Sequence, residues 1–335
     1  MTINRIVVLT TGGTIASRPD DSGRNRSGEL KGEALLAQVN LPPGFEYEIE
    51  VRSVLQKPSN AMTYDDLLLL HEQCQALAES PDVRGVVITH GTDTLEETAF
   101  FLDITIASRL PVVLTGSQRA PHEPGTDAFR NLADALLVAA SSQAAGSGAL
   151  VVFNQSIYAA RQVRKTSTFQ ANGFAAPETG PIGYVDGPRV YFASHPIRAS
   201  ALALPTGSTL PRVDILPAYL GASPHLIEAA VTTGAAGLVI DGLGRGHVPP
   251  DWMPSIIGVI ESGVPVALVS SCLTGPVHKS YEFTGSLADL EASGVQPMLD
   301  LSARKARLAL AVFLASSNPQ QRQNTEAIKI KTDVP

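Results

Sequence analysis

Short apolar runs recur along the first half of the chain, and each ends in a turn of small polar residues. Four such runs lie at residues 6–9, 86–89, 111–114 and 149–153. They are rich in valine, isoleucine and leucine, which predicts buried β-strands, and residues 47–54 alternate as a further strand. Helical spacing lies between them, over residues 63–78 and 128–140. Strands that alternate with helices predict a parallel sheet covered on both faces.

Two of the expected helices have recognisable first turns. Thr63 and Asp66 have the spacing of a capping box, in front of a leucine-rich run that also holds Cys74 as an expected core residue. A second helix is expected after His90, with Glu96 and Glu97 in its first turn, where acidic residues favour the helix dipole. A short helix is also expected over residues 32–39.

A linker rich in proline, serine, threonine and alanine is predicted over residues 194–212. It follows a hairpin signal at residues 183–192 and separates an N-terminal domain, residues 1–193, from a smaller C-terminal α/β domain, residues 213–335. The second domain's expected strands are 213–216, 238–240 and 264–269, and its expected helices are 224–233, 251–262 and 302–315. The end from residue 318 reads as a loose polar tail.

The composition is that of an ordinary globular protein: of 335 residues, 44% are hydrophobic and 17% are charged. A formal charge of −7 argues against a nucleic-acid or anionic-membrane partner. The two cysteines fit neither a metal site nor a disulfide framework. No leader pattern and no membrane-spanning run is visible, so we expect a cytoplasmic protein.

Three of the expected strands are followed by similar turns of glycine and polar residues. The three turns read Thr11-Gly-Gly-Thr14, His90-Gly-Thr-Asp93 and Thr115-Gly-Ser-Gln118. In open parallel sheets, ligands bind beyond the carboxyl ends of the strands, so these turns are expected to converge on one pocket. The glycine-rich stretch 242–247 lacks the spacing of a dinucleotide-binding loop and predicts no cofactor site.

A threonine in such a turn becomes a nucleophile only if a neighbouring base takes its proton. His90 on a strand end is more often a structural hydrogen-bonder. A lysine serves as a base only where its surroundings bring its pKa down from about 10.4 toward neutrality. From spacing alone, a solvated basic residue is the better interpretation of Lys165, and Asp93 is either a ligand for an ammonium group or a helix N-cap.

Four segments closely resemble bacterial-type L-asparaginases: Thr11–Ile15, Thr89–Ala99, Pro111–Arg119 and the Lys165 segment. The resemblance implies a large and a small α/β domain and hydrolysis of L-asparagine to L-aspartate and ammonia, without metal or organic cofactor. It also implies a homotetramer built as a dimer of dimers. Two other functions stay open, a mixed glutaminase-asparaginase and a non-catalytic amino-acid sensor on the same fold.

The same resemblance implies individual roles. Thr14 matches the primary nucleophile, Thr92 and Lys165 match a second threonine with its lysine, and Asp93 matches the residue that binds the substrate amino group. Further implied substrate contacts come from Ser59, Asn60, Ser117 and Glu282, the last from a neighbouring subunit. Asn60 stands where the family has glutamine, and His247 stands where periplasmic members have asparagine.

The polar segment 18–31 is expected to be a mobile lid beside the first turn, or else a disordered surface loop. The family carries a tyrosine there, whereas this segment has none, and Arg26 falls at about that position. Arginine stays protonated and is therefore no base. We expect Arg26 to bind the substrate carboxylate or to pair with Glu282 of a partner, and Tyr281 is a candidate for the missing phenol.

Overall fold

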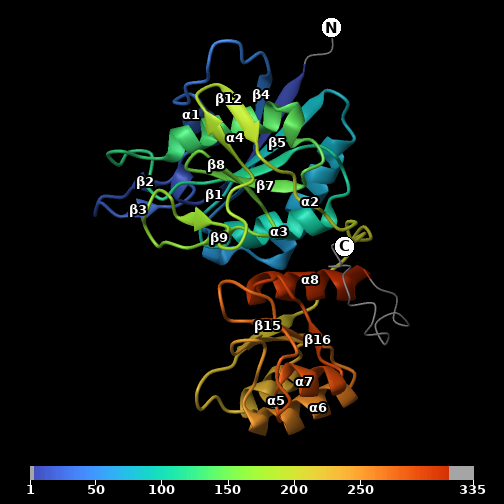
Figure 1. Ribbon diagram of the computed structural model, residues 1–335. Coiled ribbons are helices and arrows are strands. Elements are labelled where there is room, and N and C mark those ends of the chain that lie inside the picture. The colour runs from blue at the N-terminus through green and yellow to red at the C-terminus, as the bar shows by residue number, and fades with distance from the viewer. Residues whose placement is uncertain (1–3, 317–335) are drawn as a thin grey trace. The chain divides into compact units, whose positions relative to one another are not determined.

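The computed structural model describes residues 4–316, and its first structural unit is organised around strand β1, Arg5–Gly12 (Figure 1). The apolar run from Ile6 to Leu9 is buried on both faces, as expected for a central parallel strand. Strand β1 pairs in parallel with β4 (Glu48–Lys57) on one side and β5 (Val83–Thr89) on the other. The predicted strand at the start of the chain is therefore confirmed.

The sheet of the first unit has eight strands in the order β12-β11-β8-β7-β6-β5-β1-β4. The remaining strands are β6 (Val112–Thr115), β7 (Ala149–Phe153), β8 (Ser156–Ala159), β11 (Gly183–Asp186) and β12 (Arg189–Phe192). Strands from β4 to β7 are parallel, whereas β8, β11 and β12 are antiparallel to their neighbours. The predicted parallel α/β sheet thus continues into an antiparallel edge that was predicted only as the 183–192 hairpin.

Helices cover both faces of this sheet (Figure 1). Their bounds are α1 (Gly32–Leu36), α2 (Tyr64–Ala78), α3 (Leu95–Thr105) and α4 (Ala128–Ala140). Side chains of α1 and α4, including Leu35 and Leu132, pack in one cluster with Ile6 and Val8 of β1, while α2 and α3 pack together on the opposite face. Helix α2 begins with the predicted capping box, and Cys74 is fully buried.

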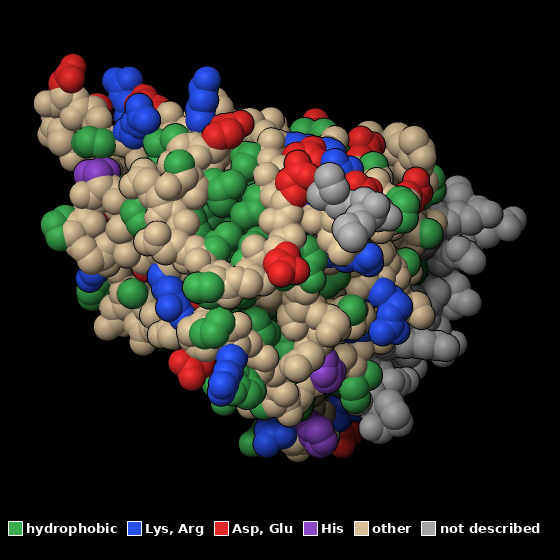
Figure 2. Space-filling view, turned by 90° about the horizontal axis from the view of Figure 1, so that it is seen from above, with side chains coloured by type: hydrophobic (Ala, Val, Ile, Leu, Met, Phe, Trp, Pro, Cys, Tyr) green, Lys and Arg blue, Asp and Glu red, His purple; other side chains and the backbone are tan. Residues whose placement is uncertain are grey.

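The outer side of α4 forms one wall of an apolar groove. Figure 2, seen from the side of α1 and α4, shows hydrophobic side chains gathered in a hollow between charged ones. The groove is lined mostly by apolar residues of α4, of the 40–42 loop and of the β11–β12 turn. Burial raises the pKa of Asp134 in this groove to about 6, although Arg130 pairs with it.

The chain divides into two structural units, residues 1–201 and 202–335, so the boundary falls inside the segment predicted as a linker. The second unit has a parallel sheet of β13 (Val213–Pro217), β14 (Gly237–Gly242), β15 (Val266–Ser270) and β16 (Gln296–Pro297). Its helices are α5 (His225–Thr232), α6 (Met253–Glu261), α7 (Leu287–Ala292) and α8 (Ala303–Ser316). The predicted tail from residue 318 lies outside the described residues.

Short elements border the ends of the β-strands in the first unit. They comprise the hairpins β2 (Arg18–Pro19) with β3 (Asn25–Arg26) and β9 (Arg164–Lys165) with β10 (Phe174–Ala175), and 3-10 turns at Thr14–Ala16, Ser59–Ala61 and Ser142–Ala144. A further 3-10 turn, Pro250–Trp252, belongs to the second unit. Within residues 4–316, none of the helices has the length and hydropathy needed to span a membrane.

Candidate active site

The three turns at the carboxyl ends of β1, β5 and β6 are in contact, because glycines let their backbones approach. A Cβ atom on Gly13 would lie 2.4 Å from Cα of Gly91, and one on Gly116 would lie 2.4 Å from the carbonyl oxygen of His90. Gly91 in turn faces Ser59, whose Oγ would be 2.7 Å from an added Cβ. The predicted convergence of the three turns is therefore confirmed, and each contact excludes any larger residue.

Thr14 is held beside the second turn by the geometry of the first. Gly13 has φ 81° and ψ −176°, a conformation essentially restricted to glycine, and it immediately precedes the 3-10 turn that Thr14 opens. Thr11 donates its hydroxyl proton to the carbonyl oxygen of Thr89 at 2.9 Å, which ties β1 to the end of β5. Thr14 itself is half-buried, so it remains partly accessible to solvent.

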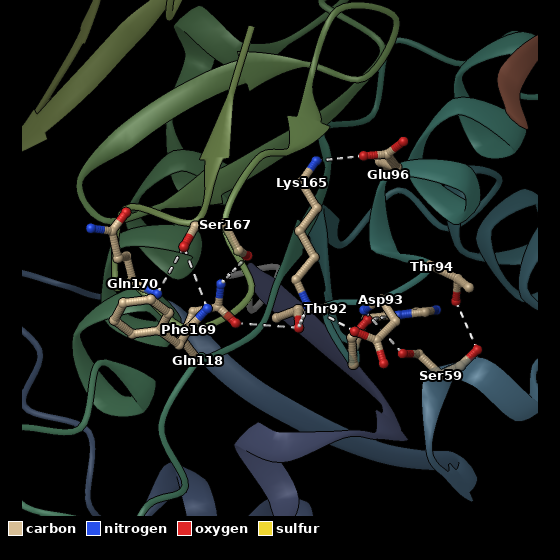
Figure 3. A network of polar contacts seen from close by, with 12 residues as sticks. Ser59, Thr92, Asp93, Thr94, Glu96, Gln118, Lys165, Ser167, Phe169 and Gln170 are labelled. Carbon is tan, nitrogen blue, oxygen red and sulfur yellow. Dashed lines mark hydrogen bonds and ion pairs between the residues drawn. The ribbon is translucent and has the colours of Figure 1, made fainter. Parts of the chain in front are cut away.

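Lys165 joins the second turn to β9 (Figure 3). Its Nζ donates to Oγ1 of Thr92 at 2.8 Å and to Oδ1 of Asp93 at 2.7 Å. Thr92 is buried and Lys165 is 18% exposed, whereas Asp93 is 64% exposed and faces solvent. The three residues form a lysine–threonine–aspartate cluster whose carboxylate remains open to a ligand.

The second turn is also fixed from the side of the 59–61 turn. The backbone N–H of Asp93 donates to Oγ of Ser59 at 3.2 Å, and the Thr94 hydroxyl donates to the carbonyl oxygen of Ser59 at 2.8 Å. Ser59 is buried, while Asn60 next to it is exposed. Ser59 therefore supports Asp93 directly, and Asn60 lies at the rim of the same turn.

His90 is a structural residue of this turn. Its Nδ1 lies 2.7 Å from the carbonyl oxygen of Gly91 and must carry the proton, because a carbonyl only accepts. Its Nε2 then accepts from the Thr98 hydroxyl at 3.0 Å. The ring is fully buried, which lowers the pKa of His90 to about 4, so it is neutral at neutral pH. The structure agrees with its interpretation as a hydrogen-bonding residue.

The third turn contributes Ser117 and Gln118. Ser117 is fully buried, and its hydroxyl donates to the carbonyl oxygen of Arg119 at 2.7 Å. The Gln118 side chain donates to the carbonyl oxygen of Ser167 at 3.2 Å and accepts from Thr92 at 3.5 Å (Figure 3). Gln118 thereby links the third turn to the second turn and to the loop that follows Lys165.

The predicted lid is an ordered hairpin. Strands β2 and β3 pair across residues 18–26, and Asn25 donates to the Glu123 carboxylate at 2.8 Å. Arg26 is 65% exposed and pairs with Asp20 at 3.8 Å and with Glu29 at 3.6 Å. In this structure Arg26 therefore forms ion pairs with carboxylates of its own segment.

The sequence alone did not predict the contacts that two residues make in this hydrogen-bond network. Glu96, expected only to favour the helix dipole, is buried and accepts the backbone N–H of Lys165. Gln118 belonged to a recognised turn, but nothing in the sequence indicated its contact with Ser167. Both contacts join segments far apart in the chain, so local sequence patterns carry no signal for them.

Glu282 and His247 belong to the second unit. Glu282 is exposed. The His247 ring packs against Tyr281 and Phe283, with ring centroids 5.5 and 5.0 Å away, and burial lowers the pKa of His247. Thr14, Thr92, Asp93, Lys165 and Ser59 are brought together within the first unit, whereas Glu282 is not part of it.

The site combines a candidate hydroxyl nucleophile, a lysine bonded to a second hydroxyl and a solvent-exposed carboxylate, all near the ends of parallel strands. This combination is typical of an enzyme that uses an activated hydroxyl group. The asparaginase N-terminal family model matches residues 5–198, and the glutaminase/asparaginase C-terminal domain model matches residues 212–326. The chain belongs to the asparaginase family.

Individual relatives are similar over nearly their whole length. The L-asparaginase of Bacillus licheniformis is 40% identical over 93% of this chain and 96% of its own. The glutaminase-asparaginase of Pseudomonas fluorescens is 33% identical, over 93% and 86% respectively. A crystal structure of a probable cytoplasmic L-asparaginase from Campylobacter jejuni superposes with a TM-score of 0.86 at 30% identity, covering 96% of this chain and 98% of that one.

Proposed function

We propose that the chain hydrolyses the side-chain amide of L-asparagine to L-aspartate and ammonia, with Thr14 as the nucleophile. The observation that carries the proposal is the contact of the Lys165 amine with both Thr92 and Asp93, beside the turn that presents Thr14. L-Asparagine has an ammonium group for the exposed Asp93 carboxylate and an amide for a hydroxyl nucleophile. Ligand binding alone would not require a lysine held against a threonine hydroxyl.

The reaction divides into two steps of the same kind. The Thr14 hydroxyl adds to the side-chain amide carbon, its proton passes to the amide nitrogen, and the C–N bond breaks to release ammonia. Water then adds to the resulting ester, gives up a proton, and the Thr14 oxygen leaves and takes up a proton. In both steps the proton is carried by the Thr92 and Lys165 pair.

The Asp93 carboxylate links substrate binding to the lysine. Lys165 and the substrate ammonium would share this one carboxylate. Asp93 therefore orients both the substrate and the Lys165 amine. Ser59 holds Asp93 for both purposes, while Asn60 and the carbonyl group of Ser117 contact the substrate.

The test compares Thr14→Ala and Lys165→Met with the wild type in release of ammonia from L-asparagine. We expect each to fall below about 1% of wild-type turnover, because general acid–base and nucleophilic catalysis together exceed about a hundredfold. Circular dichroism checks that each variant is folded. Unchanged ammonia release by either folded variant contradicts the mechanism.

The second candidate is a mixed glutaminase-asparaginase, favoured by the similarity to the Pseudomonas fluorescens enzyme. Glutamine differs by one methylene, which is worth only about 1–3 kcal/mol of discrimination in a pocket. Initial rates with asparagine and glutamine at equal concentrations decide between the two. Comparable values of kcat/KM for both substrates favour the mixed activity.

We also propose a homotetramer, a dimer of dimers in which Glu282 contributes to a site of the partner. Exposed apolar side chains flank Glu282 in the sequence: Tyr281 is 55% exposed and Phe283 48%, and Leu273 of the same unit is 64% exposed. Such a patch is typical of a surface that another subunit covers. A fully active monomer in analytical ultracentrifugation at assay concentration contradicts this assembly.

The location we propose is the cytoplasm, in line with the similarity to the probable cytoplasmic L-asparaginase of Campylobacter jejuni. Fractionation of cells that express the full gene, with detection by antibody, checks it. Recovery of the protein from a periplasmic or extracellular fraction contradicts it.

A further inference from the structure

Glu96 has an unusual environment for an acidic residue in the first turn of a helix. An acid that served only the dipole of α3 would lie at the surface, as Asp65 does in the first turn of α2. Glu96 is instead 5% exposed. A buried carboxylate is costly unless strong hydrogen bonds compensate it, so its partner indicates its role.

That partner is the backbone of Lys165. The backbone N–H of Lys165 donates to Oε2 of Glu96 (Figure 3). Sixty-nine positions separate the two residues in the chain. The bond thus connects α3 to β9, a strand of two residues that pairs only with the equally short β10 in the described structure.

Both ends of Lys165 are consequently attached to one continuous segment. Its amine bonds to Thr92 and Asp93 in the turn before α3, and its backbone bonds to Glu96 in the first turn of that helix, three positions beyond Asp93. A lysine side chain has several rotatable bonds and loses considerable entropy when ordered. Attaching its backbone at a set distance from the two groups that its amine must reach restricts where the amine lies.

We infer that Glu96 is a positioning residue for Lys165, and that its carboxylate places the β9 backbone so that the amine reaches Thr92 and Asp93. This inference rests on the proposed function, in which that amine carries a proton. Glu96 acts through the reach of its side chain, from α3 to the Lys165 backbone. Its charge alone, near the helix N-terminus, is not sufficient.

Two conservative variants separate reach from charge. Glu96→Gln keeps the length and one acceptor oxygen but removes the charge. Glu96→Asp keeps the charge but withdraws the carboxylate by one methylene. We expect Glu96→Asp to lower kcat about a hundredfold, the effect of displacing a reacting group by about 1 Å, and Glu96→Gln to remain within about tenfold of wild type. KM should change by less than about threefold in both, because Ser59 holds Asp93 independently.

Asp65→Asn provides the matched control, since it removes one carboxylate from the first turn of a neighbouring helix whose acid is exposed. Wild-type kinetics are expected for it. The opposite order, with Glu96→Asp near wild type and Glu96→Gln strongly impaired, assigns the effect to charge and overturns the inference. Equal loss in both variants, or in KM instead of kcat, also overturns it.

The same assay keeps the two proposals apart. A wild type that releases no ammonia from asparagine contradicts the proposed function and this inference with it. An active wild type together with a fully active Glu96→Asp contradicts only the role of Glu96. Melting temperatures of all variants, measured by circular dichroism, show whether a change in kcat follows loss of folded protein, which would also count against positioning.

Discussion

Gly13→Ala should separate the effect of close packing between the three strand-end turns from the general cost of replacing a glycine. A Cβ at Gly13 would lie 2.4 Å from both Cα and N of Gly91, and these are backbone atoms that no side-chain rotation can move aside. Ordinary contacts begin near 3.4 Å, so the first and second turns would have to separate by about 1 Å. That movement takes Thr14 away from Thr92.

The expected magnitude has two parts. The conformation of Gly13, with φ 81° and ψ −176°, costs a residue with a side chain about 1–3 kcal/mol. Forcing the turns apart adds about 1–3 kcal/mol, as is typical when a packed site receives extra atoms. Turnover should fall about a hundredfold for a displacement of about 1 Å.

Gly23→Ala is the matched control. Gly23 also has a positive φ, 79°, but an added Cβ would find no atom within 4 Å. It should lose about 1–2 kcal/mol through strain alone and keep wild-type turnover. The assay is urea unfolding followed by circular dichroism, paired with ammonia release. If both variants lose the same stability, or if Gly13→Ala keeps full turnover, the proposed packing of the turns is wrong.

Two further predictions concern His90 and Arg26. The pKa of His90 is lowered to about 4 in the folded state, whereas an unfolded histidine titrates near 6.5, so only the unfolded state gains a proton between these values. The free energy of unfolding should therefore decrease as pH falls from about 6.5 to 4, by about 3 kcal/mol more than in the His90→Gln variant. Urea unfolding at several pH values measures this difference. Parallel pH profiles for the wild type and the variant would contradict the prediction. Arg26→Ala should raise KM with little change in kcat; unchanged kinetics indicate a plain surface residue, and a large fall in kcat alone refutes substrate binding by Arg26.

Local patterns in the sequence were sufficient for many of the regular elements. The capping box at Thr63 and the helix at 128–140 depend on neighbours within four positions, and the structure has both. The glycines at positions 13, 91 and 116 indicated turns that other groups approach closely, because only glycine permits such contacts. These signals depend only on residues that are close in the sequence, so they can be recognised without knowledge of the fold.

The edge of the sheet shows where the local signal fails. Strand β8 follows β7 through Asn154 and Gln155, which both have positive φ, 48° and 66°. This tight hairpin usually calls for glycine, so the sequence gives no clear hairpin signal there. The backbone N–H of Asn154 donates to Asn131 at 2.9 Å, a contact with α4 that helps to hold the turn. Tertiary packing therefore overrides the preference of the two residues.

The lysine–threonine–aspartate cluster is likewise a product of the tertiary structure. Sequence similarity indicated Thr92, Asp93 and Lys165 as partners, but spacing alone left Lys165 as a solvated cation. The chain brings the lysine to the second turn through Glu96 and the β9–β10 pair, across separations that no periodic pattern encodes. The sequence determines which chemical groups are available. The distances between those groups, on which their chemistry depends, are set only when the folded sheet brings the strand ends together.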